Sequence, residues 1–224
     1  MNKPFSWNRT LAMALVMGAM SLGTTEAWST DGVFPPTAKP YGLSFADWNG
    51  EWGQWAFSLG VDQSPFGDPD GRYCQVNQTA PVFFLGSTFG GSAVRQCAVP
   101  AGRSILLPVG GDICILGLSA DTEDGLRACL EDVRKGLANA SADIDGVPVK
   151  DIGKYWFASD LFTFTVTDNN VLGVPAGDYQ AMTGGIVVIH TPLAVGQHVV
   201  HFHDEFPAFD FVSDTTYNLT VTPH

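Results

Sequence analysis

The segment from His198 to Glu205 carries the densest set of side chains that could do chemistry. A strand places every second residue on one face, so His201, His203 and Glu205 share a side. Two histidines separated by one residue on a strand can reach one metal ion, and a nearby carboxylate can be a third ligand or a base. We therefore predict a divalent transition-metal site at these three residues. The alternative is a polar strand face on which the histidines are solvated or paired with Glu205.

His190 is the obvious further ligand, but the expected strand pairing separates it from this row. If residues 185–190 and 198–206 form a hairpin, His190 lies opposite His198, and His201 lies opposite Val187. The histidines would then divide into a pair at the loop end and a row on the other face.

Three tryptophans form a second candidate site. Trp48, Trp52 and Trp55 recur at helical spacing within residues 44–59, and aromatic rings can stack on the sugar rings of a glycan. The alternative is that they pack in the core beneath a sheet, which their position on one broad apolar helix face favours.

An acidic loop offers a third candidate. Asp62, Asp68 and Asp70 lie among glycines and prolines, and clustered carboxylates can hold calcium at extracellular concentrations. The rest of an EF-hand loop is missing, so a solvated acidic loop is the alternative. We expect no cofactor beyond such a divalent metal, and no motif identifies catalytic residues.

The first 27 residues indicate export. Lys3 and Arg9 precede a short apolar run that ends at Gly23, and small residues place a signal-peptidase site near Ala27. This run is too short to span a bilayer, and no later run is long enough. We therefore expect a secreted or periplasmic bacterial protein without stable membrane insertion.

The compartment determines how the four cysteines are interpreted. An even number of cysteines in an exported chain indicates disulfides. Three pairings are possible, and we predict Cys74–Cys97 with Cys114–Cys129 because both close local loops. The absence of a C-x-x-C spacing disfavours a metal or redox role for them.

The negative net charge of the chain argues against two classes of partner. The formal net charge is −12, although only 15% of the residues are charged. Such a surface repels nucleic acid and anionic membranes, so we expect neither as a partner.

The elements expected to position these residues are mostly strands. Residues 28–43 predict an extended lead-in, and helical spacing predicts helices near 44–59 and 122–137. Strands are expected near 82–85, 92–99, 104–109, 143–147, 161–166, 178–182, 185–190, 198–206 and 215–222. Short strands with regular turn signals predict a mainly β fold, a single β-sandwich of Ig-like or jelly-roll type over 44–224, with the two helices packed on it. The expected core comprises Phe83, Leu85, Ile105, Leu107, Phe162, Phe164, Val188, Val200, Phe202 and Leu219.

Four short motifs lie in the first half of the mature chain. They are Trp48-x-x-x-Trp52-x-Gln54-Trp55-Ala56, Pro81-Val82-Phe83-Phe84-Leu85, Gly90-Gly91 and Arg95-x-Cys97-x-Val99-Pro100-x-Gly102. With them the chain resembles a group of exported bacterial proteins of unknown function. The resemblance implies export and a mainly β fold, and it implies no activity and no catalytic residues.

These observations together favour a non-catalytic binding module of the cell envelope or the secreted space, with a glycan or an envelope component as its partner. One alternative is a metal-dependent enzyme that uses His201 and His203. Another is a jelly-roll polysaccharide lyase or hydrolase. A catalytic triad or a carboxylate pair has no sequence signature of its own, because its members converge only in space.

Overall fold

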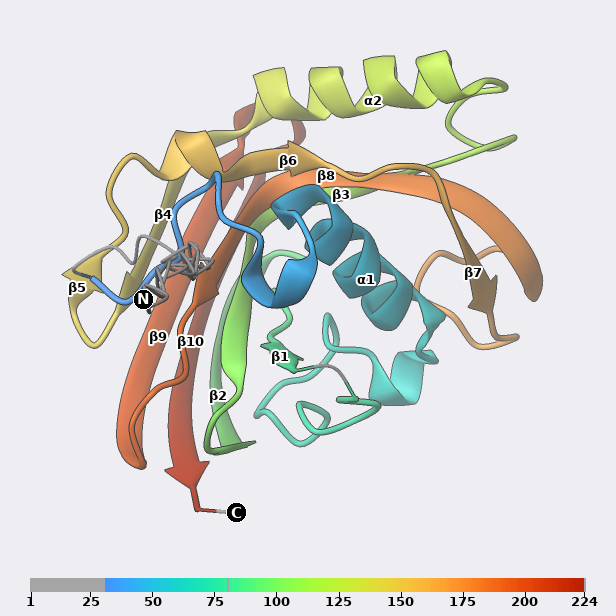
Figure 1. Cartoon of the computed structure of the whole chain (residues 1–224). Coiled ribbons are helices and arrows are strands. Elements are labelled where there is room, and N and C mark those ends of the chain that lie inside the picture. Colours follow the sequence, from blue (N-terminus) through green and yellow to red (C-terminus); the bar gives the residue numbers. More distant parts are fainter. Residues whose placement is uncertain (1–30, 80, 224) are drawn as a thin grey trace, which may run out of the picture.

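The computed structural model describes residues 31–79 and 81–223, and the statements below concern these residues. The predicted signal peptide lies outside them. The described chain folds into two mixed β-sheets and two α-helices, which confirms the mainly β prediction (Figure 1). No helix within it is long and apolar enough to cross a membrane.

The first sheet, called sheet A, is centred on the antiparallel pair β3 and β8. β1 pairs with β3 in parallel, while β6 and β7 both pair with β8. The bounds are β1 Val82–Phe84, β3 Ser104–Ile115, β6 Trp156–Ala158, β7 Phe162–Val166 and β8 Gly177–His190.

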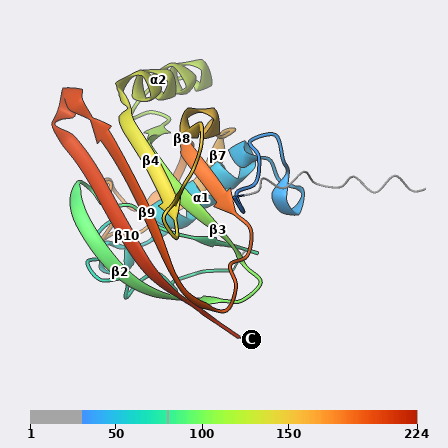
Figure 2. The same cartoon turned by 90° about the vertical axis from the view of Figure 1, so that its left-hand side faces the viewer.

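The second sheet, called sheet B, has the strand order β2-β10-β9-β4-β5 (Figure 2). β2 and β10 run in parallel, and the other neighbours are antiparallel. The bounds are β2 Gly91–Pro100, β4 Ala138–Ile144, β5 Val147–Pro148, β9 Gly196–Phe206 and β10 Phe211–Thr222. Short 3-10 helices lie at Pro40–Gly42, Val61–Gln63, Ile152–Tyr155 and Pro207–Phe209.

The predicted hairpin between residues 185–190 and 198–206 is wrong. β8 belongs to sheet A and β9 to sheet B, so the chain changes sheets after His190. The strands predicted at 178–182 and 185–190 are parts of the continuous strand β8, which includes the glycines at 184 and 185. They mark close packing, because a Cβ atom on Gly184 would lie 3.0 Å from Leu130 Cδ2, and one on Gly185 would lie 2.8 Å from the carbonyl oxygen of Gly110.

Sheet A carries a helix on each face (Figure 1). α1 (Phe45–Ser58) packs on β7 and β8, and α2 (Glu123–Gly136) packs on the other side of β8 and on β3. Gly53 allows the α1 contact, since a Cβ atom there would lie 2.5 Å from Thr183 Cγ2. Leu126 and Leu130 of α2 are buried in a small separate cluster with Cys114 and Met182.

Both predicted disulfides are present. Cys74 is bonded to Cys97, and Cys114 is bonded to Cys129, so no described cysteine is free. The first ties the loop that follows α1 to β2, and the second ties α2 to β3.

The main core is shared by both sheets and α1. Nine of the ten residues predicted as core are buried, and the tenth, Phe162, is partly buried against the same cluster. The alternation predicted for β9 also holds: Val200, Phe202 and Asp204 face inward, and His201, His203 and Glu205 face outward.

The start of α1 is fixed by a capping box. Ser44 Oγ accepts a hydrogen bond from the Asp47 backbone N–H at 3.2 Å, and the Asp47 carboxylate accepts one from the Ser44 N–H at 2.8 Å. Because such caps satisfy otherwise unpaired helix N–H groups, Ser44→Ala is expected to lower the free energy of unfolding by about 1 kcal/mol. Urea denaturation measures this, with Ser58→Ala at the other end of the helix as the control. An equal loss in both variants would contradict the assignment.

Candidate functional site

The three residues predicted to bind a metal lie side by side on the outer face of sheet B, half-buried. The two nitrogens of His201 lie 3.2 Å from Asp143 Oδ2 on β4 and 3.2 Å from Asp214 Oδ2 on β10. The two nitrogens of His203 lie 3.2 Å from the same Asp214 oxygen and 3.1 Å from Glu205 Oε1. The row therefore alternates acid and histidine across three strands.

This geometry favours a protonated His203. An imidazole ring donates from both nitrogens only when it is a cation, whereas a metal needs a nitrogen lone pair. Partial burial opposes the charge on His203, but its hydrogen bonds to Glu205 and Asp214 prevail and raise its pKa. Among residues 31–79 and 81–223, no group of His, Cys, Asp and Glu is arranged to hold a metal ion. The metal site at His201, His203 and Glu205 stays a prediction without support from these contacts.

The other two described histidines have separate partners. His198 Nδ1 lies 2.7 Å from Asp145 Oδ2 and His198 Nε2 lies 2.9 Å from the carbonyl oxygen of Ala194. His190 is buried, which lowers its pKa, and its Nδ1 contacts the carbonyl oxygen of Thr191 at 2.6 Å. Neither contributes to the row on β9.

The three tryptophans of α1 are core residues rather than an exposed platform. Trp48, Trp52 and Trp55 are at most 8% exposed. Their indole N–H groups donate to the backbone carbonyls of Pro40, Leu85 and Val76 at 2.8–2.9 Å. Their burial agrees with the core interpretation that the helical spacing favoured, and it leaves no exposed surface for glycan stacking at these three residues.

The acidic loop does not gather its carboxylates. The Asp68 side chain accepts hydrogen bonds from the backbone N–H groups of Asp70, Gly71 and Tyr73 and so shapes the loop. Asp70 pairs with Arg72 at 2.6 Å, and Asp62 accepts from Asn169 at 2.6 Å. A calcium site has no support from these contacts, since each carboxylate has a different partner.

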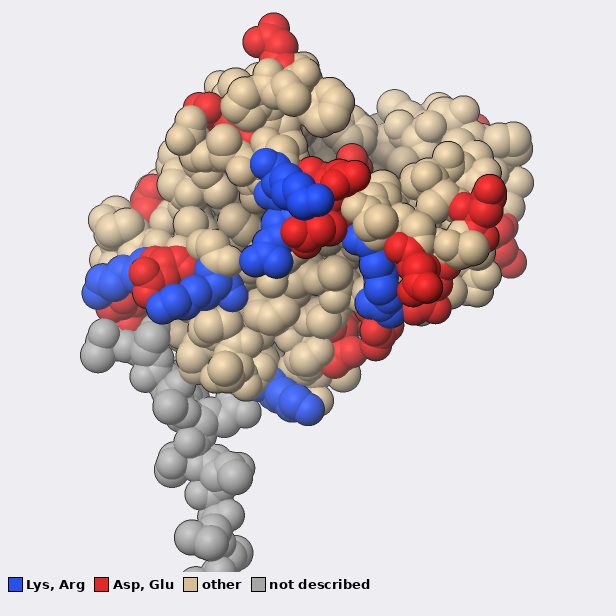
Figure 3. All heavy atoms as spheres, turned by 90° about the horizontal axis from the view of Figure 1, so that it is seen from above, with Lys and Arg blue, Asp and Glu red and all other residues tan. Residues whose placement is uncertain are grey.

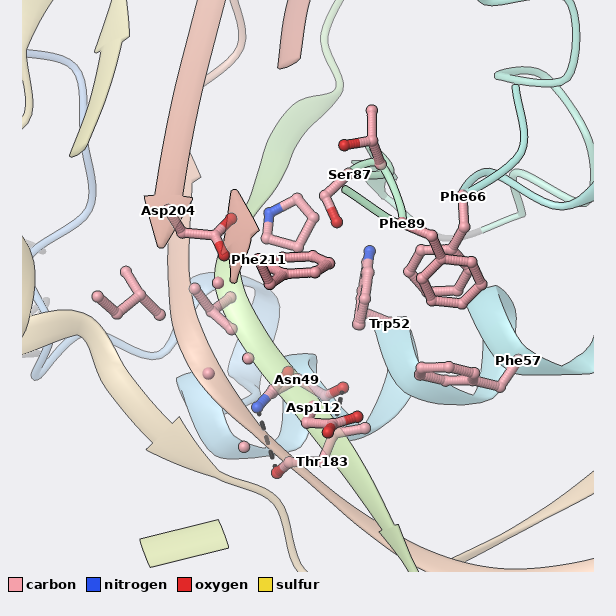
Figure 4. A pocket seen from close by; sticks show the side chains of 18 residues that line it. Asn49, Trp52, Phe57, Phe66, Ser87, Phe89, Asp112, Thr183, Asp204 and Phe211 are labelled. Carbon is pink, nitrogen blue, oxygen red and sulfur yellow. Dashed lines mark hydrogen bonds between the residues drawn. The ribbon is translucent and has the colours of Figure 1, made fainter. Parts of the chain in front are cut away.

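A cavity where the two sheets and α1 meet was not predicted from the sequence (Figure 4). Its volume is about 80 Å³. Five aromatic side chains line it, namely Trp52, Phe57, Phe66, Phe89 and Phe211. Two carboxylates, Asp112 of β3 and Asp204 of β9, line it as well. In Figure 4 the aromatic side chains from α1 and the loops lie opposite Asp204, with Asp112 and Asn49 below.

Glycines make room for this cavity. The ladder between β3 and β8 is irregular between Val109 and Gly111, and Gly110 has a φ of 69°, in the left-handed region that favours glycine. A Cβ atom at Gly110 would lie 2.8 Å from Asp204 Cβ. The bulge therefore lets β9 approach β3 closely, which brings Asp204 of sheet B to the floor formed by sheet A.

Desolvation by the surrounding protein atoms raises the pKa of both carboxylates. Asp204 is 2% exposed, and this burial raises its pKa to about 6, although a hydrogen bond from Ser213 and the nearby His203 oppose the shift. Asp112 is exposed, but the protein atoms packed around its carboxylate still raise its pKa, despite a hydrogen bond from the Ile113 N–H at 2.7 Å. Carboxylates with raised pKa values in a cavity are typical of functional sites.

The sequence matches no family model and no curated protein. A search of solved structures finds one chain, described as "Structure of PbICP-C in complex with falcipain-2". It is 9% identical, with a TM-score of 0.23, covering 64% of this chain and 98% of that chain. A similarity at this level carries no argument about fold or function.

Arg95 of β2 holds the loop that supplies one wall of the cavity. Its guanidinium is fully buried and donates to the carbonyl oxygens of Asp68, Gly86 and Ser87 at 2.8, 2.6 and 3.3 Å. It also donates to the hydroxyl of Tyr217 at 2.9 Å. Since Ser87 and its neighbours Thr88 and Phe89 line the cavity, Arg95 acts as a positioning residue. The buried arginine in the Arg95-x-Cys97 motif was the available signal, but the sequence does not show what it contacts.

Proposed function

We propose that this protein is an exported, non-catalytic binding module whose ligand occupies the cavity between sheet A, sheet B and α1. The observation that carries the proposal is the convergence of five aromatic side chains and two carboxylates from distant parts of the chain around one cavity. Binding sites are typically concave and mostly apolar, with a few polar groups that orient the ligand.

Export is supported by the leader-like residues 1–27 and by the two disulfides, which persist in oxidising compartments. The core shared by both sheets supports one β-sandwich domain. The resemblance to exported bacterial proteins fits this compartment.

The size of the cavity favours a small ligand or the end group of a larger one. A volume of about 80 Å³ holds a few water molecules or a small head group, not a length of polymer. With the α1 tryptophans buried, an extended glycan has no aromatic platform there. An envelope component that presents a small terminal group remains a suitable partner.

Catalysis is the second candidate, because Asp112 and Asp204 share the cavity and both have raised pKa values. A pair of carboxylates with shifted acidity can act as acid and base on a bound substrate. The NMR experiment described in the next paragraph distinguishes catalysis from binding, because turnover of a substrate gives signals of a product.

Saturation-transfer NMR tests the proposal with a panel of neutral sugars, organic cations and carboxylic acids. At least one class is expected to receive saturation from the wild-type protein and to lose it in Ser87→Leu, because Ser87 points into the cavity (Figure 4). Ser92→Leu, exposed and outside the lining, is the control. No transfer to any class, or transfer unchanged by Ser87→Leu, would reject the proposal, and product resonances would favour the enzyme.

A further inference from the structure

We propose that the ligand of this cavity is a methylated organic ammonium ion, an inference that rests on the proposed binding function and names its ligand class. The cavity combines negative charge with aromatic walls, and these are the two features by which proteins recognise such cations.

The first argument is uncompensated charge. None of the lining residues, all within the described chain, is Lys, Arg or His. Burying the Asp204 carboxylate without a cationic partner in the cavity costs free energy, and a bound cation would offset that cost. Within the lining, Asp112 accepts only the Ile113 N–H, and Asp204 accepts a hydrogen bond from Ser213.

Several basic side chains on the outside of the protein form ion pairs with acids. Over α2, blue and red side chains lie next to one another (Figure 3). Arg127 pairs with Glu123 at 2.6 Å, and Lys135 pairs with Asp132 at 3.0 Å. The net charge of −12 attracts cations to the protein as a whole. The two carboxylates in the cavity add a local negative charge at the proposed binding site.

The second argument is the aromatic wall. Phe89 is 57% exposed and stacks on Phe66 with ring centroids 4.4 Å apart. Phe211 lies across the cavity from this pair (Figure 4). An exposed phenylalanine held by stacking at a cavity is a suitable wall for methyl groups that share a positive charge.

Other ligand classes fit less well. An anion would meet two carboxylates and no basic side chain. A neutral sugar needs several donors as well as acceptors. The Ser87 hydroxyl points into the cavity, but the indole N–H of Trp52 donates to Leu85 O, and the amide of Asn49 donates to the carbonyls of Phe157 and Thr183. The carboxylates thus dominate the polar character of the lining.

The placement of Asp204 supports the assignment. Its carboxyl is faced by Ser213 and by the cavity, while His203 lies on the outer side of β9 and is not part of the lining.

Isothermal titration calorimetry with choline tests the inference. The matched probe is its uncharged isostere, in which carbon replaces the ammonium nitrogen. Choline is expected to bind at millimolar or lower concentration, at least about tenfold more tightly than the isostere. Asp112→Asn and Phe89→Leu are each expected to weaken choline binding about tenfold. Asp132→Asn and Phe209→Leu, which change an exposed carboxylate and an exposed ring outside the lining, are expected to bind as wild type.

Equal affinity for choline and the isostere would overturn the ammonium assignment, as would choline binding unaffected by Asp112→Asn. If choline fails while another panel member binds in a way that Ser87→Leu abolishes, the ammonium inference is wrong and the binding function stands. If no panel member binds, the binding function itself is wrong.

Discussion

Replacing Arg95 with methionine is expected to lower the free energy of unfolding by about 4 kcal/mol. Methionine fills much of the same space but removes the guanidinium donor from the carbonyl oxygens of Asp68, Gly86 and Ser87. Of these, the carbonyl oxygen of Gly86 keeps a second partner, the Tyr217 hydroxyl at 3.0 Å. Each buried acceptor that loses its partner costs about 1–3 kcal/mol, and the tyrosine hydroxyl at 217 loses a donor as well. Urea denaturation of the disulfide-intact protein measures the loss.

The matched control is Arg72→Met in the neighbouring loop. The Arg72 side chain is 58% exposed and pairs with Asp70 on the surface, so Arg72→Met is expected to unfold at nearly the same urea concentration as the wild type. If Arg95→Met does not fold, Arg95→Lys retains one charged donor and is expected to show an intermediate loss. A loss below about 1 kcal/mol in Arg95→Met would show that the buried guanidinium is not what holds the loop at residues 86–88.

The sequence predicts the elements well because their patterns are local. The capping residue Ser44, the apolar spacing of α1 and the alternation in β9 each depend on neighbours a few residues away. The loop lengths between cysteines also led to the correct disulfides. Local chemistry therefore accounts for most helix and strand positions.

Strand pairing depends on packing between distant segments, and the pairing predicted from the sequence for residues 185–190 and 198–206 is wrong. A seven-residue loop between His190 and His198 suggested a hairpin, but β8 pairs with β3 and β9 pairs with β10. The glycines at 184 and 185 separated two predicted strands because a missing side chain serves both a turn and a close contact, here with Leu130 of α2 and with Gly110 of β3. Nothing within the segment distinguishes the two uses.

The candidate site escaped prediction for the same reason. Asp112 and Asp204 have no local motif in common, and they share a cavity only because the bulge at Gly110 brings β9 against β3. The common face of His201 and His203 was predictable, but their partner Asp214 depends on the register of β10. A site whose side chains come from several strands can be predicted only when the register between those strands is known.

Asp204 is expected to make the protein less stable as the pH rises. Its pKa in the folded protein is about 6, above the ordinary value of 3.8, so the folded state holds the proton more tightly than the unfolded chain. The stabilising contribution is complete below about pH 4 and is lost as the pH rises through about 6. The shift corresponds to about 3 kcal/mol, of which about 2 kcal/mol falls between about pH 4 and about pH 7.5.

Asp204→Asn removes this titration while its amide oxygen can still accept the hydrogen bond from Ser213. Urea denaturation at the two pH values is expected to show that the wild type loses about 2 kcal/mol relative to Asp204→Asn on going to the higher pH. Other titrating groups cancel in this difference, because both proteins contain them. Asp132→Asn, whose side chain is 77% exposed on α2, is expected to follow the wild type. If Asp204→Asn also follows the wild type at both pH values, the buried carboxyl at the cavity floor is ionised as easily as one in water, and the electrostatic basis of the site is wrong.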